Sequence, residues 1–389
     1  MTIEPIAWTG WRGPSRDAIV PWLPDRLPRE AKPVWQRKLL DQGLSGIAAT
    51  EKLVLVVDRD ANDQQDLFLA LNADSGQVEW SLQYEAIGRL DYGNSPRATP
   101  LIHDNIAFLF GAFGHLHCVD LETGIVLWQK NIRDEFHVND KLIWGTASSP
   151  LMADDQLIIN PGAPDASLVA LDPLTGDVIW QTPGAPAAFS SFVVTELNGE
   201  KQLIGYDKES LGGWSLENGK RLWRHAPKHP NDFNVPTPVI ADSQLVVCTE
   251  NNGTRLFAFN KDGRLRPEPL GTHRDLAPDS HTPVAINGRL FGIWDGLFCL
   301  DLKNNLRELW TSDDEAFNHY ASIIASQDRI LITNEKSELI LLDATADKFT
   351  PLSRLKIFEN DSGVFSHPAI VGSRLYVRGS DQIVCLSLS

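Results

Sequence analysis

The chain has 389 residues and 42% hydrophobic content, enough to bury a large core. Its formal net charge of -16 and its lack of any Lys/Arg run exclude the electrostatic attraction to phosphate that nucleic-acid binding requires. No apolar stretch reaches membrane-spanning length and residues 1–11 do not resemble a signal peptide, so we expect no membrane insertion and a monomer that is cytoplasmic or a mature exported form.

The first 32 residues form a lead segment that contains the string WTGWRGPSRD at 8–17. We expect this segment to pack on a single domain formed by residues 33–389. The next stretch, PVWQRKL at 33–39, is predicted to be a strand that has no partner beside it in the sequence.

A repeat becomes visible at residues 67–80. Each copy has an apolar stretch, a short polar turn and a second stretch that ends in Trp. The four regular copies are LFLALNADSGQVEW (67–80), LHCVDLETGIVLW (116–128), LVALDPLTGDVIW (168–180) and GGWSLENGKRLW (212–223). Less regular copies follow at 257–267, 298–310 and 340–351, and a second recurring piece such as TPLIHDNIAFLF precedes each copy. The spacing predicts a repeat of about 46 residues that forms four short strands.

The turn inside each copy explains its residue types. An Asp or Asn, as at Asn72 and Asp120, stands where the third strand enters the turn, and its short side chain can accept backbone N–H groups. A Gly, as at Gly76 and Gly124, stands four residues before the Trp and can close the hairpin at positive φ. The Trp side chains are predicted to be structural, wedged between neighbouring repeats. These residues are Trp35, Trp80, Trp128, Trp180, Trp223 and Trp310.

Eight copies of the outermost strand can be counted. Six contain the Trp residues just given, and the other two fall at the Pro267 position and at 349–351. The last copy, at 365–389, stops after its third strand, and residues 33–39 supply the missing fourth. The sequence therefore predicts an all-β, eight-bladed β-propeller with four-stranded blades, closed by the N-terminal strand pairing in the last blade.

The connections between repeats differ in length. The turns inside the repeats stay short, whereas the connections at 81–99 and 131–149 are long, and the loop RDANDQQD at 59–66 is long and acidic. Loops set on a rigid scaffold usually carry recognition residues. We therefore select Arg97, His137 and Trp144 on these connections as candidate ligand-binding residues.

A column of polar residues precedes the first strands. It consists of Ser45, Thr99, Ser149, Ser191, Thr237, Thr282, Ser322 and His367. Such hydroxyls commonly bond crowded backbone near the axis of a propeller. The alternative is a small polar ligand or an ion held there, with Arg97, His281, His319, Tyr320 and His367 around it. We predict no metal site, because the His residues lie far apart in the sequence.

The repeat string L-x-[AC]-L-[DN]-x-x-[TS]-G-x-x-x-W, carried by residues 69–80, 118–128 and 168–180, resembles the repeat of pyrroloquinoline quinone (PQQ) dehydrogenases and their non-enzymatic relatives. Residues 8–17 also resemble the opening of many bacterial PQQ-like propellers. The resemblance covers residues 33–389. It implies membership of the PQQ-like β-propeller family, which includes uncharacterised PQQ-binding-like repeat proteins and outer-membrane assembly-factor propellers.

Family dehydrogenases typically carry two adjacent cysteines over the quinone, calcium ligands and a catalytic Asp. The cysteines of this chain stand apart at 118, 248, 299 and 385, and three of them fill one repeat column, so we expect buried core residues without a disulfide. We predict no cofactor, with PQQ and calcium as the alternative.

Three functions stay open. The first is a non-catalytic scaffold that binds a protein partner or a small polar ligand, because no set of nucleophile, base and orienting group is visible. The second is a PQQ-dependent alcohol or sugar dehydrogenase with a diverged site. The third is a hydrolase or lyase on the same fold, since fold does not determine function.

Overall fold

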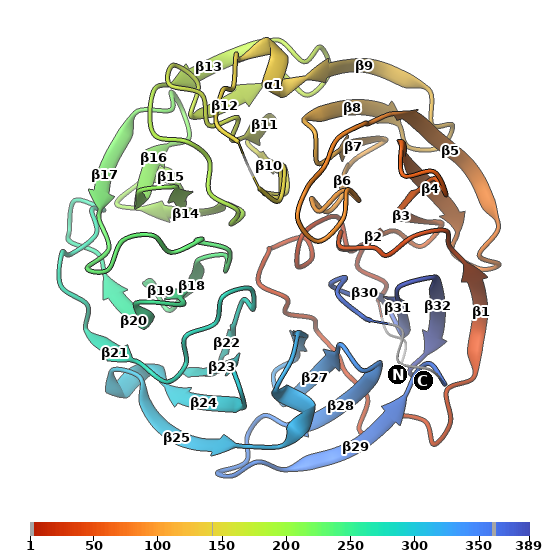
Figure 1. The fold of residues 1–389 in the computed structure, drawn as a ribbon. Helices are drawn as coiled ribbons and strands as arrows, with labels where there is room; N and C mark the ends of the chain where they lie inside the picture. The colour runs from red at the N-terminus through yellow and green to blue at the C-terminus, as the bar shows by residue number, and fades with distance from the viewer. Residues whose placement is uncertain (1–3, 142, 360–362) are drawn as a thin grey trace. The chain divides into compact units, whose positions relative to one another are not determined.

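The computed structural model describes residues 4–141, 143–359 and 363–389. Its strands form eight four-stranded antiparallel sheets, which confirms the predicted all-β, eight-bladed β-propeller (Figure 1). Helical structure in the described residues is limited to α1 (Ile132–Glu135) and to two short 3-10 turns, η1 (Leu302–Asn304) and η2 (Glu315–Phe317). Two compact units can be distinguished by their internal contacts, and each is described by itself below.

The first unit comprises residues 1–129, 143–146 and 314–389. Four blades belong to it, although β9 ends two residues inside the second unit. The blades are β2 (Ala48–Ala49), β3 (Leu53–Arg59), β4 (Gln65–Asn72) and β5 (Val78–Glu85); β6 (Leu101–His103), β7 (Ile106–Phe110), β8 (His115–Asp120) and β9 (Val126–Asn131); β26 (Ala321–Ala325), β27 (Arg329–Asn334), β28 (Glu338–Asp343) and β29 (Pro351–Lys356); and β30 (Ala369–Val371), β31 (Arg374–Arg378), β32 (Gln382–Ser387) and β1 (Pro33–Lys38).

The last blade is built from both ends of the chain, as the sequence predicts. β1 pairs antiparallel with β32, with Trp35 opposite Cys385. Buried polar groups fix the chain that follows β1: the Asp58 carboxylate accepts backbone N–H groups of Leu40 and Asp41, and Arg378 donates to the Asp41 carbonyl at 2.7 Å. The N-terminal strand is therefore held by ladder hydrogen bonds and by a buried charged pair.

The second unit comprises residues 130–142 and 147–313. Its four blades are β10 (Leu151–Ala153), β11 (Gln156–Ile159), β12 (Leu168–Leu171) and β13 (Val178–Thr182); β14 (Val193–Leu197), β15 (Glu200–Asp207), β16 (Ser210–Ser215) and β17 (Arg221–His225); β18 (Val239–Ala241), β19 (Gln244–Thr249), β20 (Gly253–Ala258) and β21 (Gly271–His273); and β22 (Val284–Ile286), β23 (Arg289–Ile293), β24 (Leu297–Asp301) and β25 (Arg307–Ser312).

The position predicted for one outermost strand is wrong. The sequence placed it at Pro267, whereas β21 begins at Gly271 and has only three residues. Two prolines at 267 and 269 explain the shift, because proline lacks the N–H group that a strand ladder requires.

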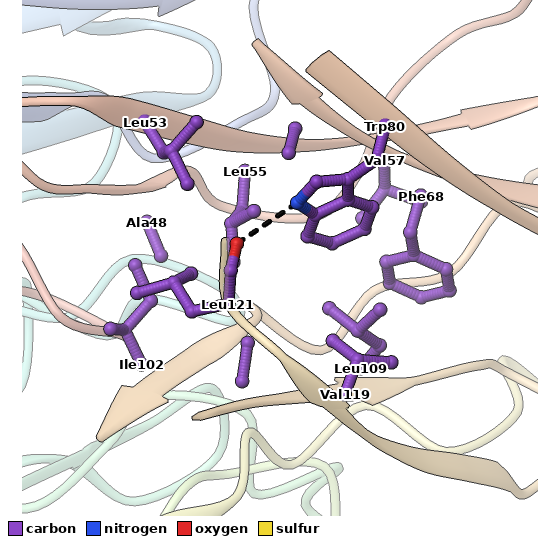
Figure 2. Close-up of a cluster of buried hydrophobic side chains, with 12 residues drawn as sticks. Ala48, Leu53, Leu55, Val57, Phe68, Trp80, Ile102, Leu109, Val119 and Leu121 are labelled. Carbon is purple, nitrogen blue, oxygen red and sulfur yellow. Dashed lines mark hydrogen bonds between the residues drawn. The ribbon is translucent and has the colours of Figure 1, made fainter. Parts of the chain in front are cut away.

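The joint between neighbouring blades is made by Trp and Gly. The Trp80 indole N–H donates to the Leu121 carbonyl of the next blade at 2.9 Å and packs among aliphatic side chains of both blades (Figure 2). A Cβ atom at Gly124 would lie 2.6 Å from the indole, so only Gly admits the ring there. Trp35 packs on Gly76 and Trp180 packs on Gly219 in the same way, whereas Trp128 is only half-buried.

The lead segment is irregular and lies against inner strands of the first unit. Trp8 forms an antiparallel bridge with Ala49 of β2, and the Thr9 carbonyl accepts from Ile102 of β6 at 2.7 Å. Further along, the segment exchanges two backbone hydrogen bonds with Ala325 of β26. Residues 8–20 thus contribute backbone partners to three first-unit blades.

Candidate functional site: an aromatic surface on two loops

The site lies on residues 86–97, which follow β5, and on residues 143–146, both in the first unit. These loops carry three exposed apolar side chains and one half-buried Trp, which we together call the loop patch: Ile87, Tyr92, Ile143 and Trp144. Ile87 is 63% exposed and Tyr92 is 79% exposed, whereas the Trp144 side chain is half-buried. The ring centroids of Tyr92 and Trp144 lie 6.2 Å apart at an interplanar angle of 55°. The backbone N–H of Asp91 donates to the Ile143 carbonyl at 3.0 Å and joins the two loops.

Arg97 holds the loop at residues 86–97 through three hydrogen bonds to backbone carbonyls. Its guanidinium donates to the carbonyls of Ser95, Asp91 and Gly93 at 2.7, 2.7 and 2.8 Å. Burial lowers the pKa of Arg97 to about 10, so the group stays cationic near neutral pH. The planar fork of an Arg side chain suits such multiple bonds. Arg97 therefore fixes the backbone on either side of Tyr92.

A second, fully buried arginine holds the base of the loop. Arg59 donates to the Ala86 carbonyl at 2.8 Å and pairs with the carboxylates of Asp63 and Asp66. The Asp63 carboxylate accepts in turn from Asn94 at 2.6 Å. The loop is shorter than the predicted 59–66, because β3 extends to Arg59 and β4 begins at Gln65. Arg59 and Asp66 are buried, whereas the Asp63 side chain is exposed.

Asp66 lies at the centre of that cluster. Tyr84 donates to its carboxylate at 3.0 Å, and the Tyr84 ring packs against His117 with ring centroids 4.5 Å apart and an interplanar angle of 30°. Burial raises the pKa of Asp66 to about 6, although Arg59 and Tyr84 both act in the opposite direction. Burial also lowers the pKa of His117 to about 4. These groups support the loop from the interior of the unit.

Tyr92 has a left-handed backbone conformation. Its φ of 62° lies in the left-handed region, which a residue with a Cβ atom adopts at a cost of about 1–2 kcal/mol. The following Gly93 also has positive φ, at 89°. Sequence reasoning selected Arg97 and Trp144 but missed Tyr92, Ile87 and Ile143. The Tyr–Gly pair within a long polar loop was the signal that could have identified Tyr92.

The other candidate residues of the first unit lie around the lead segment. His367 is buried between Trp8, stacked at 5.9 Å, and Trp11, edge-on at 5.4 Å. Tyr320 packs on Phe365 at 5.8 Å. His319 is exposed. The structure thus engages His367 and Tyr320 in packing and leaves His319 at the surface.

The second unit holds the remaining candidates. His137 is exposed just after α1, and His281 is half-buried before β22. In the hydroxyl column of this unit, the Ser191 and Thr282 side chains accept the backbone N–H groups of Ser149 and Thr237, each at 3.0 Å. These bonds agree with a structural role for the column.

The metal-ligating and thiol side chains of the described residues are dispersed. No set of three or more His, Cys, Asp or Glu side chains in residues 4–141, 143–359 and 363–389 is arranged to hold a metal ion. All four cysteines are buried with free thiols. Burial raises the pKa of Cys118 to about 12 and that of Cys385 to about 11, so both stay protonated. No helix in the described part of the chain is long and apolar enough to span a membrane.

Comparisons with known proteins agree with the β-propeller fold. A family model described as outer membrane protein assembly factor BamB matches residues 28–144 and 97–350, well over half of the chain. The chain is 24% identical over 285 residues to the outer membrane protein assembly factor BamB of Shewanella oneidensis, covering 71% of this chain and 67% of that protein.

Two further similarities place the fold among related propellers. The crystal structure of BamB from Moraxella catarrhalis is similar with a TM-score of 0.64 and 14% identity, covering 91% of this chain and 99% of that chain. A shorter match, 29% identical over 142 residues, joins 33% of this chain to 22% of the quinoprotein alcohol dehydrogenase PedH of Pseudomonas putida. The match therefore spans about a fifth of that enzyme.

Proposed function

The chain belongs to the protein family described as outer membrane protein assembly factor BamB, and from this membership we propose that it is a non-catalytic scaffold that binds a protein partner during the assembly of outer membrane proteins. The partner contacts the loop patch in this proposal. Catalysis is not required of such a scaffold, and the four patch residues carry no nucleophile or base arrangement.

The observation that carries the proposal is the fixed display of Tyr92 beside Trp144. Tyr, Trp and Arg are the residue types that dominate binding energy at protein interfaces. An aromatic side chain on a rigid loop loses little conformational entropy when a partner binds. Arg97 provides that rigidity through its three carbonyl bonds, and Ile87 and Ile143 extend the apolar surface around the rings.

Deletion of the gene in its native host, followed by complementation, tests the proposal. The measured quantity is the amount of folded β-barrel protein in the outer membrane. We expect deletion to lower it, the natural chain to restore it, and the double variant Tyr92→Ala/Trp144→Ala to restore little of it. Ile125→Ala is the matched control, because Ile125 is 64% exposed on the hairpin turn after β8 and should complement fully.

A photo-crosslinking residue at position 92, and the same residue at position 125, adds a direct readout. A discrete adduct with one outer-membrane assembly protein is expected from position 92 only. Equal adducts from both positions, or full complementation by the double variant at normal abundance, would contradict the assignment of the loop patch as the partner-binding surface.

A PQQ-dependent oxidoreductase is the second candidate, and the short match to PedH favours it. The residues present do not fit that cofactor: the cysteines stand in four separate strands, β8, β19, β24 and β32, and the described residues offer no cluster of metal ligands. We derive no chemical step through a quinone for this reason.

Thermal unfolding with PQQ and Ca²⁺ decides this point, together with a dye-linked assay of alcohol and sugar oxidation. We expect no shift in melting temperature and no turnover. Saturable PQQ binding with turnover would contradict the scaffold proposal and support a PQQ-dependent oxidoreductase.

A further inference from the structure

The outermost strand of the first blade in the second unit is an open sheet edge. β13 is the last strand of the sheet β10-β11-β12-β13, and within the described part of the chain no strand pairs with its outer side. Val178 is 42% exposed and Ile179 is 48% exposed, while Trp180 points into the core. β13 therefore presents backbone hydrogen-bonding groups and aliphatic side chains together.

The sequence of β13 differs from those of the other outermost strands. β13 reads VIWQT and has no charged residue and no Pro. Six other outermost strands of the described chain carry at least one: PVWQRK in β1, VEWSLQYE in β5, VLWQKN in β9, RLWRH in β17, RELWTS in β25 and PLSRLK in β29. The remaining one, β21, has only three residues. Charges and Pro on an edge strand oppose pairing with a foreign chain, and β13 has neither, although its pairing with β12 contains one register shift, opposite Ala170 and Leu171.

The stretch of sequence that contains β13 is acidic. Residues 142–200 contain no Lys, Arg or His. The same stretch holds Asp154, Asp155, Asp165, Asp172, Asp177, Glu196 and Glu200. Two of these carboxylates are exposed beside the strand: Asp177 directly precedes it, and the Asp165 carbonyl accepts from the Gln181 side chain at 3.3 Å. A basic partner is favoured here by charge complementarity.

We propose that β13 accepts an extended segment of another protein as a fifth strand of its blade, and that this segment alternates aliphatic residues with Lys or Arg. Ladder hydrogen bonds to the outer side of β13 hold the backbone of the segment. Aliphatic side chains of the segment contact Val178 and Ile179, which are both exposed beside the register shift of β13, and the basic side chains approach Asp165 and Asp177. The inference goes beyond the proposed function, because this surface belongs to the other unit and does not depend on the loop patch.

A fluorescent ten-residue peptide of alternating Val and Lys is the probe, titrated into the full chain and followed by fluorescence anisotropy. We expect saturable binding that Ile179→Lys weakens at least about tenfold, which corresponds to about 1.4 kcal/mol. Val78→Lys is the matched control, because Val78 is an exposed aliphatic residue on the outermost strand β5 and should leave the affinity unchanged. Melting temperatures confirm that both variants fold.

Two further peptides separate strand pairing from simple charge attraction. The same peptide with alternate residues N-methylated keeps its charge but cannot complete a ladder, and a Val–Glu peptide keeps the ladder but reverses the charge. We expect neither to bind, and we expect the Val–Lys peptide to slow amide hydrogen exchange within residues 178–182. Binding of the N-methylated peptide, equal loss in both protein variants, or dimers through β13 without peptide binding would each overturn the proposal.

Discussion

At the scale of single residues, His367 shows how burial changes a polar group. Its ring lies between Trp8 and Trp11, and its Nδ1 atom lies 2.9 Å from the Pro368 carbonyl oxygen. Burial, together with the nearby Arg12 guanidinium, lowers the pKa of His367 to about 3. The folded chain thus holds a neutral imidazole where the unfolded chain binds a proton below pH 6.5 or so.

A pH dependence follows from this difference. Since the folded pKa is the lower one, the stability that neutral His367 provides is complete above about pH 6.5 and is lost as the pH falls toward 3. Between pH 7 and pH 5 the natural chain should lose about 2 kcal/mol more than His367→Gln in its free energy of unfolding. Urea midpoints across this range measure the difference. The exposed His137→Gln is the control, and parallel curves for the natural chain and His367→Gln would contradict the assignment.

At the scale of elements, the joint between blades depends on one Trp and one Gly acting together. Trp80 ends its repeat and Gly124 belongs to the hairpin of the next blade, yet the indole covers the position that a Cβ atom would take. The periodic Gly therefore has two roles, since it also adopts a positive φ of 71° in the hairpin.

A double-mutant cycle tests this coupling. Trp80→Ala should cost about 3–5 kcal/mol by removal of a buried aromatic side chain. Gly124→Ala should cost more in the natural chain than in the Trp80→Ala background, where only the strain of positive φ, about 1–2 kcal/mol, remains. We expect a coupling energy of at least about 1 kcal/mol from denaturant midpoints. Additive losses would mean that the two residues do not share the contact.

The elements also show how far the sequence could lead. The strands within each blade were predictable, because strand period and hairpin chemistry are local signals. The pairing of β1 with β32 was predictable from repetition, because the last repeat lacks one strand and residues 33–39 match it. The loop patch was not, because the display of Tyr92 depends on bonds from Arg97, Asn94 and Arg59 that join separate parts of the chain. Whether the candidate residues bind anything stays a prediction.

At the scale of the whole molecule, both ends of the chain stabilise the first unit. The lead segment buries Trp8 and Leu23, and β1 buries Trp35 against the last blade. Each such side chain contributes about 1.5–3 kcal/mol on burial. Residues 4–40 are therefore part of the folded unit, although they precede the repeats.

Two truncations separate these contributions. Removal of residues 1–40 should expose the edge of β32 and lower the melting temperature by about 10 °C or more, with aggregation through the open edge. Removal of residues 1–20 keeps β1 and should cost less. Calorimetry and sedimentation measure both effects. A loss of only a few degrees in the longer truncation, with the chain still monomeric, would contradict the role given to β1.

The pairing of β1 with β32 also determines when the last blade can form during synthesis of the chain. Roughly 350 residues separate the two strands, and a ribosome adding about 5–20 residues per second needs about 20 to 70 s to produce them. During this interval β1 is outside the ribosome without its partner, while the intervening blades can already fold. The last blade can assemble only after β32 has been synthesised, so a chain that stalls or terminates before β32 carries an unpaired β1 and is a natural substrate for chaperones and proteases.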